Sequence, residues 1–440
     1  MNTTILTGDE YSQVGSRSKF GLAKVILTIS IAVLVGILHI SGIFPPDDPP
    51  SYRIQVAAVA VGLMLVISAG KMGNFSKLKF TMLFLWSGFA VMTLLSALIY
   101  DEKLQAVIWV CLGVPYLIFC VFPHASGRHG NLMILVAIIL GLMPYLVWSL
   151  AKYSLDTPFR GVFENNNSFG MTVTTVTACL FALLRGAIGA KRKNFLHWTW
   201  IVGLSVSVVG AFLLIIMSNS RTSLLCFSVL LMIFLGSLLF NAYKNRYWIV
   251  LAIAVMLGAI AFFAGSVFLD DHKDGYANKM IAKIETKWKS GDVSDGRLPI
   301  WKAVVNDITL LGRGGSTFSA YYGGLAHNTY ITVLGSVGIV AMLFIVLIHG
   351  LVLFLACRMA AKNIRDDGYA IGPLLVVMNY FALGMTELVF GLLGNGINMT
   401  FLLMTGVLIN AQGVGETEME FSPAQQTQAQ LGMQLGGEAQ

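Results

Sequence analysis

The tracts SDGRLPIW (residues 294–301), GRGGSTF (residues 312–318) and AHNTYI (residues 326–331) lie in one polar interval, Asp270 to Asn328. Long apolar segments precede and follow this interval. Away from the chain ends, it is the only polar stretch longer than the roughly 20 residues that a spanning helix needs. The interval therefore separates two membrane-embedded parts, and we expect it to contribute much of the functional site.

The composition defines the class of protein. Of the 440 residues, 56% are hydrophobic and 12% are charged, whereas soluble domains carry about 25% charged residues. The sequence therefore predicts an all-α polytopic membrane protein with no soluble domain. The net charge of +7 does not indicate a nucleic-acid partner, because its distribution follows the membrane topology.

Apolar runs of about 20 residues predict about twelve spanning helices. We expect a cytoplasmic segment at residues 1–21, nine helices in residues 22–269, an outside loop at residues 270–328, three helices in residues 329–411 and a disordered cytoplasmic tail at residues 412–440. The expected spans are 22–43, 54–70, 80–99, 105–123, 131–151, 168–186, 199–218, 222–240, 247–269, 329–356, 370–390 and 394–411.

The distribution of Lys and Arg predicts the orientation. With the N-terminus inside, sixteen basic residues fall in cytoplasmic segments. Five fall in short outside loops, namely Arg53, Lys103, Lys152, Arg160 and Arg221. The positive-inside rule then places both termini in the cytoplasm and the loop at residues 270–328 outside it.

Two helices are expected within the large loop. In YANKMIAKIETKWK (residues 276–289) the apolar residues share one face, and Glu285 and Lys289 form a favourable i,i+4 pair. This helix suits either a membrane surface or the surface of the helical bundle. A second helix is expected to begin near Pro299 and to end before the glycines at residues 312–315.

Three arginines outside the membrane are candidates for phosphate binding. Arg221 lies in a tight reversal, SNSRTS (residues 218–223), Arg297 precedes a helix start, and Arg160 lies in FRGVFENNNSFG (residues 159–170). Arginine binds phosphate through bidentate hydrogen bonds, so convergence of these side chains indicates a lipid-linked pyrophosphate. The alternative is that each arginine snorkels to the membrane interface.

His327 is the candidate general base or hydroxyl-orienting residue; the alternative is a local hydrogen-bonding role at a helix start. The neighbouring glycines allow backbone amides to approach an anion. Arg313 and Asn328 therefore join the candidate substrate-binding residues.

Acidic residues offer a rival site. Asp270, Asp271, His272 and Asp274 lie together, followed by Asp292 and Asp295. Such a cluster could hold a divalent cation, but a solvated charge cluster is the commoner explanation. The cysteines show no spacing typical of a disulfide framework or zinc site; they are Cys111, Cys120, Cys179, Cys226 and Cys357. We expect no metal and no cofactor in the site.

Glu387 is the one acidic residue within a predicted span. An intramembrane carboxylate is a functional candidate. Its position near the outer end of the span favours pairing with an outer arginine over a proton path.

Taken together, SNSRTSLL (residues 218–225), SDGRLPIW, GRGGSTF and AHNTYITVLGSVGIV (residues 326–340) resemble the O-antigen ligase family of bacterial envelopes, a superfamily that includes O-antigen polymerases and protein O-oligosaccharyltransferases. The resemblance covers residues 160–340. It implies a GT-C-like enzyme of the inner membrane whose active site faces the periplasm. It also implies metal-independent, inverting transfer of a polysaccharide from undecaprenyl pyrophosphate to lipid A–core, within a bilayer whose lipids it contacts.

The resemblance matches the family's functional residues to Arg221, Arg297 and His327, with Arg160 and Asn166 as secondary matches. A polymerase and a protein O-oligosaccharyltransferase remain alternatives within the superfamily. A lipid-linked glycan flippase is the alternative from another class, and it predicts charged residues in several spans, whereas Glu387 stands almost alone.

Overall fold

A computed structural model of the chain describes residues 25–39, 76–101, 127–155, 158–190, 194–245, 282, 285–286, 289, 296–364, 367–390 and 396–419. The predicted spans at residues 54–70, 105–123 and 247–269, the acidic tract at residues 270–274, Asp292, Asp295, Cys111, Cys120 and both ends of the chain lie outside this part.

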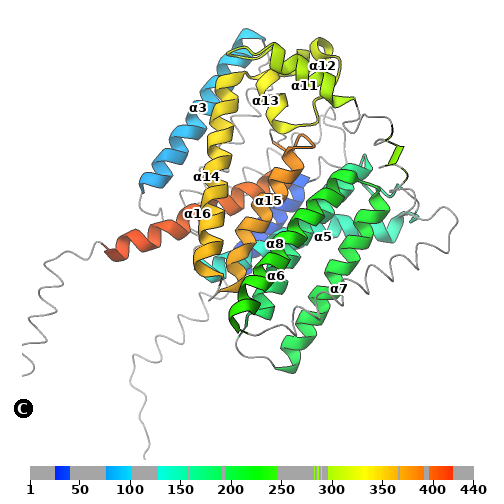
Figure 1. Ribbon diagram of the computed structural model, residues 1–440, viewed down its shortest axis with the longest axis vertical. Helices are drawn as coiled ribbons and strands as arrows, with labels where there is room; N and C mark the ends of the chain where they lie inside the picture. The colour runs from blue at the N-terminus through cyan, green and yellow to red at the C-terminus, as the bar shows by residue number, and fades with distance from the viewer. Residues whose placement is uncertain are drawn as a thin grey trace, which may run out of the picture.

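All regular secondary structure in the described part of the chain is helical, and no strand occurs in it (Figure 1). Six helices in this part are long and apolar enough to cross a membrane. They are α3 (Lys77–Ile99), α5 (Gly127–Lys152), α6 (Asn166–Ile188), α7 (Phe195–Ser218), α8 (Arg221–Asn245) and α14 (Ile339–Asn363). The all-helical polytopic architecture is confirmed, whereas the number twelve stays a prediction.

Three further apolar helices are shorter. The first is the helix Val25–Leu38, and the second joins η2 (Gly368–Ile371) to α15 (Gly372–Gly384). The third is α16 (Gly396–Met419), which continues into the segment expected to be a tail. Its residues from 396 to 410 are buried; such all-round burial marks a helix at the centre of a bundle.

Helix α6 is the other central helix, and it packs against α5, α7, α8 and α15 (Figure 1). Nearly all of its residues are buried, including Thr172, Thr174, Thr175 and Thr177. Each of these hydroxyls donates to a carbonyl in the preceding turn. Because this bonding satisfies the hydroxyls within their own helix, α6 tolerates a polar sequence in an apolar core.

Two predicted spans are interrupted. The span at residues 329–356 is two helices, α13 (Thr329–Ser336) and α14, broken at Val337 and Gly338. Gly338 has φ +102°, and a Cβ there would collide with the carbonyl of Leu310. The close passage of this loop requires a glycine and stops the helix.

The predicted span at residues 370–390 is also shorter than expected. Helix α15 ends at Gly384, and residues 385–390 are not helical. Glu387 therefore lies in an irregular segment beyond the helix. The apolar character of MTELVFG (residues 385–391) concealed this end, because hydropathy does not distinguish a buried loop from a helix.

Part of the large loop forms a folded cap together with the first turns of the next predicted span. It contains α11 (Arg297–Asn306), α12 (Gly315–Tyr322) and α13. A small core joins them, made of Val304, Phe318, Tyr322, Ala326 and Leu334. The predicted helix near Pro299 is confirmed as α11. Four residues of the other predicted helix, at residues 276–289, are described, and all four are helical. Among them, an ion pair joins Glu285 to Lys289 at 3.5 Å.

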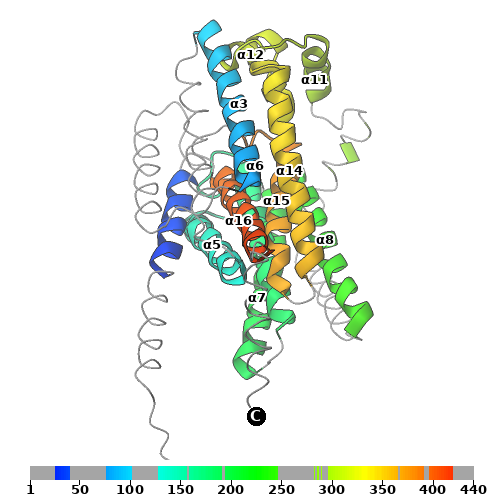
Figure 2. The same ribbon diagram turned by 90° about the vertical axis from the view of Figure 1, so that its left-hand side faces the viewer.

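The cap lies at one end of the bundle, beside the ends of α3 and α14 (Figures 1 and 2). Tyr100, which follows α3, donates its hydroxyl to the carbonyl of Gly312 at 2.7 Å. At the same end the backbone amide of Phe159 donates to Met217, near the C-terminus of α7. The reversal after α3 and the reversal after α7 therefore both lie at the capped end. The charge count predicts that both lie outside the cytoplasm.

Candidate active site

Glu387 is the centre of a cluster of polar side chains at the capped end. Its side chain is 9% exposed. His327 Nδ1 lies 3.0 Å from one carboxylate oxygen, Oε2. Asn167 Nδ2 donates to the other, Oε1, at 3.1 Å, and a guanidinium nitrogen of Arg297 lies 3.5 Å from Oε1. Since a buried carboxylate is costly unless it is paired and hydrogen-bonded, these three partners explain how Glu387 is accommodated.

The segment that carries Glu387 is held by residues from the cap. Arg297 donates to the carbonyl of Thr386 at 2.6 Å, and Asn328 donates to the carbonyl of Met385 at 2.9 Å. The hydroxyl of Thr329 donates to the carbonyl of Glu387 and accepts from the amide of Val389, both at 3.2 Å. The irregular backbone is thus hydrogen-bonded to the chain around AHNTYI.

His327 combines a strained backbone with an accessible ring. Its φ is +46°, a conformation that non-glycine residues seldom adopt and that often occurs at functional sites. The side chain is 41% exposed. While Glu387 is ionised it can only accept, so Nδ1 of His327 carries a proton. Nε2 of the neutral ring then has a free lone pair that can accept a proton.

Arg297 reaches Glu387 because of the way α11 begins. Gly296 has φ +76° and precedes the helix, and Arg297 is its first residue. The Arg297 side chain is 19% exposed. Its guanidinium has five N–H donors, so it can hold the backbone at Thr386 and still offer donors to a ligand.

Arg221 lies at the first position of α8, directly after a reversal of two residues. Asn219 adopts φ +52° and ends α7, and the hydroxyl of Ser220 accepts from the amide of Ser223 at 3.4 Å. Asn166 donates to the carbonyl of Ser218 at 2.7 Å. The tight reversal predicted from SNSRTS is therefore present, and α6 holds it in place.

The first turn of α6 links the reversal that carries Arg221 to the cluster around Glu387. Asn166 bonds the reversal that carries Arg221, and Asn167 bonds Glu387. The sequence singled out Asn166 but not Asn167. A run of three asparagines does not show which one faces which neighbour. Only the helical start, capped by Asn165, sets that register.

A comparison with protein-family models adds an independent finding. Residues 205–346 match the family model described as O-antigen ligase. This match confirms the resemblance to the O-antigen ligase family. The comparison with curated proteins finds no match.

The region that matches the family model, residues 205–346, includes only part of the cluster. Arg221, Arg297 and His327 lie within it. Asn167 and Glu387 lie outside it, so both become recognisable as part of this cluster only through the packing of α6 and of the segment after α15.

Arg313 also lies within the matched region, but it belongs to a separate group of residues in the cap. Its guanidinium forms two bonds to Asp307, at 2.6 and 2.9 Å, and lies over the ring of Tyr321. Arg313 holds the pKa of Asp307 below its ordinary value, chiefly by these hydrogen bonds. Burial, with the nearby Asp307 carboxylate, raises the pKa of Tyr322 to about 12. Arg313 thus has a structural partner within the cap.

Asn328 and Arg160 also have partners within the protein. Asn328 caps α13, because its Oδ1 accepts from the amides of Tyr330 and Ile331. Arg160 is exposed and donates to the carbonyl of Glu164 at 3.2 Å. Both lie near the capped end, but neither contact joins them to Glu387.

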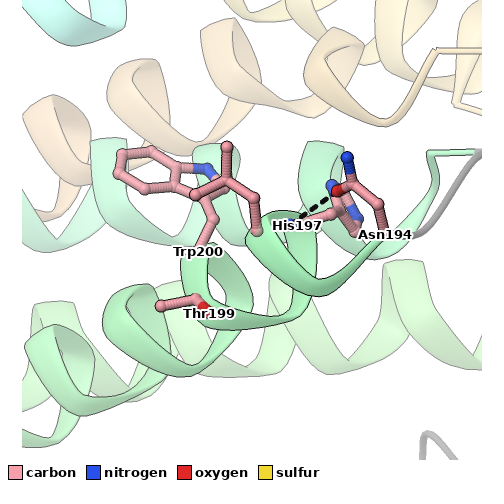
Figure 3. Close-up of a pocket in the computed structure, with 5 residues that line it drawn as sticks. Asn194, His197, Thr199 and Trp200 are labelled. Atoms are coloured by element: carbon pink, nitrogen blue, oxygen red, sulfur yellow. Dashed lines mark hydrogen bonds between the residues drawn. The ribbon is translucent and has the colours of Figure 1, made fainter.

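A cavity in the described part of the chain lies away from the cluster around Glu387. A cavity of about 480 Å³ opens at the start of α7, lined by Asn194, Leu196, His197, Thr199 and Trp200 (Figure 3). It is at the other end of α7 from Arg221 and plays no part in this site. Within the described ranges, no three His, Cys, Asp or Glu side chains gather as metal ligands.

Proposed function

We propose that this protein is an O-antigen ligase. In this proposal it transfers a preassembled polysaccharide from undecaprenyl pyrophosphate to a sugar hydroxyl of lipid A–core. The reaction takes place on the periplasmic side of a bacterial inner membrane. The observation that carries the proposal is the contact of His327 with Glu387, a carboxylate that Arg297 also approaches. His327 and Arg297 lie inside the region that matches the O-antigen ligase family, and Glu387 lies outside it.

His327 is proposed to be the general base. The acceptor hydroxyl oxygen forms a bond to the anomeric carbon of the donor, and its proton moves to Nε2 of His327. Glu387 orients the ring through Nδ1 and stabilises the imidazolium that forms, as a carboxylate does in other acid–base groupings. A positioned base contributes about 10²–10⁴-fold to such reactions.

The arginines are proposed to act on the leaving group. As the bond between the anomeric carbon and the phosphate oxygen breaks, the electron pair stays on undecaprenyl pyrophosphate. Arg221 and Arg297 offer guanidinium donors to this growing negative charge. Arg160, Asn166, Arg313 and Asn328 remain proposed contributors to glycan or pyrophosphate binding. Since pyrophosphate is already a good leaving group, orientation and charge stabilisation supply the remaining catalysis.

The decisive experiment uses the purified full-length protein with undecaprenyl-pyrophosphate glycan and lipid A–core in mixed micelles. We expect glycan-extended lipid A–core, and loss of the product in the variants Arg221→Ala, Arg297→Ala and His327→Ala. Longer lipid-linked glycans without lipid A–core product identify a polymerase instead. If all three variants keep full activity at equal expression, the site is wrongly assigned.

A second arm tests the acidic rival. We expect activity to survive EDTA. Strict dependence on Mg²⁺ or Mn²⁺ moves the site to the tract that begins with Asp270 and Asp271.

A further inference from the structure

His349 lies in the core of the bundle, on α14, and only 2% of the residue is exposed. Its Nδ1 lies 3.0 Å from the hydroxyl of Tyr330. Its Nε2 has no hydrogen-bond partner among the described residues. The ring is enclosed edge-on by five aromatic rings, of Tyr330, Tyr380, Phe381, Phe390 and Phe401, at centroid distances of 5.1–5.7 Å. The bond to Tyr330 is thus the one polar contact of this histidine within the described part.

Tyr330 is the second residue of α13, three positions after His327. Helix α13 has eight residues, and a helix this short has little stability of its own. It is also separated from α14 by the break at Val337 and Gly338. Leu334 in the cap core, and the amides of Arg313 and Gly314 that donate to Gly335 and Ser336, hold its C-terminal half. The place of His327 depends in addition on contacts near the N-terminus of α13.

The other contacts near this N-terminus do not reach a long helix. Asn328 and Thr329 bond the irregular segment at residues 385–389, which Arg297 and Asn167 also hold. Tyr330, in contrast, bonds a side chain in the interior of α14, a 25-residue helix. Figure 1 shows α13 beside the upper end of α14, with α15 close by.

We propose that Tyr330 and His349 are positioning residues, whose hydrogen bond ties α13 to the membrane core and keeps His327 in place against Glu387. The catalytic consequence rests on the proposed function; the structural consequence does not. Neither residue touches the reacting atoms. The enclosing aromatic rings contribute by holding the imidazole in one orientation, so that Nδ1 faces the hydroxyl.

The test must separate positioning from simple stability. Removing one partner strands a buried polar group and destabilises the fold, whereas replacing both with apolar groups of similar shape can be nearly neutral. The variant Tyr330→Phe/His349→Leu is therefore compared with each single variant. The matched control is Thr175→Val/Asn379→Leu, which removes a buried bond of 3.0 Å between α6 and α15 without touching α13.

Two measurements are made on the full-length protein in micelles. Hydrogen exchange is followed at the amides of Tyr330 and Ile331, which Asn328 caps, and kcat and KM are measured in the transfer assay. We expect the Tyr330/His349 double variant to melt within a few degrees of the unmodified protein. Its two amides should exchange faster, and kcat should fall at least about 10-fold, the effect of a bond worth about 1.4 kcal/mol, with KM little changed.

Two further outcomes sharpen the test. The control variant should leave the exchange of the two amides and kcat unchanged. The single variant His349→Asn, which retains a polar atom close to the Nδ1 position, should keep most of the kcat that the double variant loses. The inference is wrong if the double variant keeps both the normal exchange of these amides and the normal kcat. If the unmodified protein transfers no glycan, the proposed function fails, and the exchange data alone decide whether the bond positions α13.

Discussion

At the scale of single residues, the charge of Glu387 matters more than its shape. Glu387→Gln keeps the size of the side chain but loses the negative charge that we propose to stabilise a protonated His327. We expect kcat to fall by about 10²–10⁴-fold, close to the loss from removing the base itself. Steady-state kinetics of Glu387→Gln, His327→Ala and the double variant measure this. Because the two groups act as a unit, the double variant should lose little more than the worse single variant.

Asn167 supports a second prediction at this scale. Asn167→Ala removes a donor to Oε1 of Glu387, and hydrogen bonds to charged groups are worth about 1.5–3 kcal/mol. If that stabilisation acts on the transition state, kcat should fall about 10–100-fold. Thr177→Val is the matched control: Thr177 lies further along α6, where its hydroxyl donates to the carbonyl of Val173 at 2.8 Å, so this change should have little effect on kcat. Equal kinetic effects from both variants would contradict a specific role for Asn167.

At the scale of elements, the break between α13 and α14 depends on Gly338. In Gly338→Ala the new Cβ would meet the carbonyl of Leu310 at a backbone φ that alanine seldom adopts. We expect a loss of more than about 1 kcal/mol in stability and weaker attachment of the cap. Gly350→Ala is the control, because no atom of another described segment lies within 4 Å of its Cβ position; that change should leave stability equal or slightly higher. Thermal unfolding in detergent compares the two variants.

The cap has its own pH dependence. The pKa of Asp307 is lowered, chiefly by the hydrogen bonds from Arg313. A lowered folded-state pKa stabilises the folded cap above the ordinary pKa of the carboxyl group, and this contribution is lost as the pH falls through the lowered value. Acid-active proteolysis should therefore cut the cap faster only below pH 3.8, the ordinary value. The Asp307→Asn variant should be cut faster than the unmodified protein already at neutral pH. Equal rates at neutral pH would show that the pair of Asp307 and Arg313 contributes nothing.

At the scale of the whole molecule, the cap and the far end of α14 should lie on opposite sides of the membrane. Lys302 of α11 and Lys362 of α14 are both exposed, and the charge count places Lys362 in the cytoplasm. In a cysteine-free background, a membrane-impermeant maleimide should label Lys302→Cys in spheroplasts. It should label Lys362→Cys only after lysis. Labelling of Lys362→Cys in intact spheroplasts would invert the predicted orientation.

The sequence by itself determined the class of fold and most of the relevant residue types. Long apolar runs require helices, since a bilayer offers no hydrogen-bond partner to an open backbone. The positions of α3, α5, α6, α7 and α8 follow from this requirement. Arg297 and His327 stood out as candidates because a polar loop between apolar runs has few reasons other than function to combine such residues.

Only the tertiary structure decided which side chains meet. Glu387 lies 60 residues from His327 and 90 from Arg297 along the chain, and Asn167 lies 220 residues from it. Periodicity and hydropathy describe each segment separately, so they placed Glu387 in a spanning helix and passed over Asn167. The meeting of these groups depends on where α15 ends, how α6 begins and how α13 breaks from α14. Each of these is set by packing against distant segments, which no local pattern encodes.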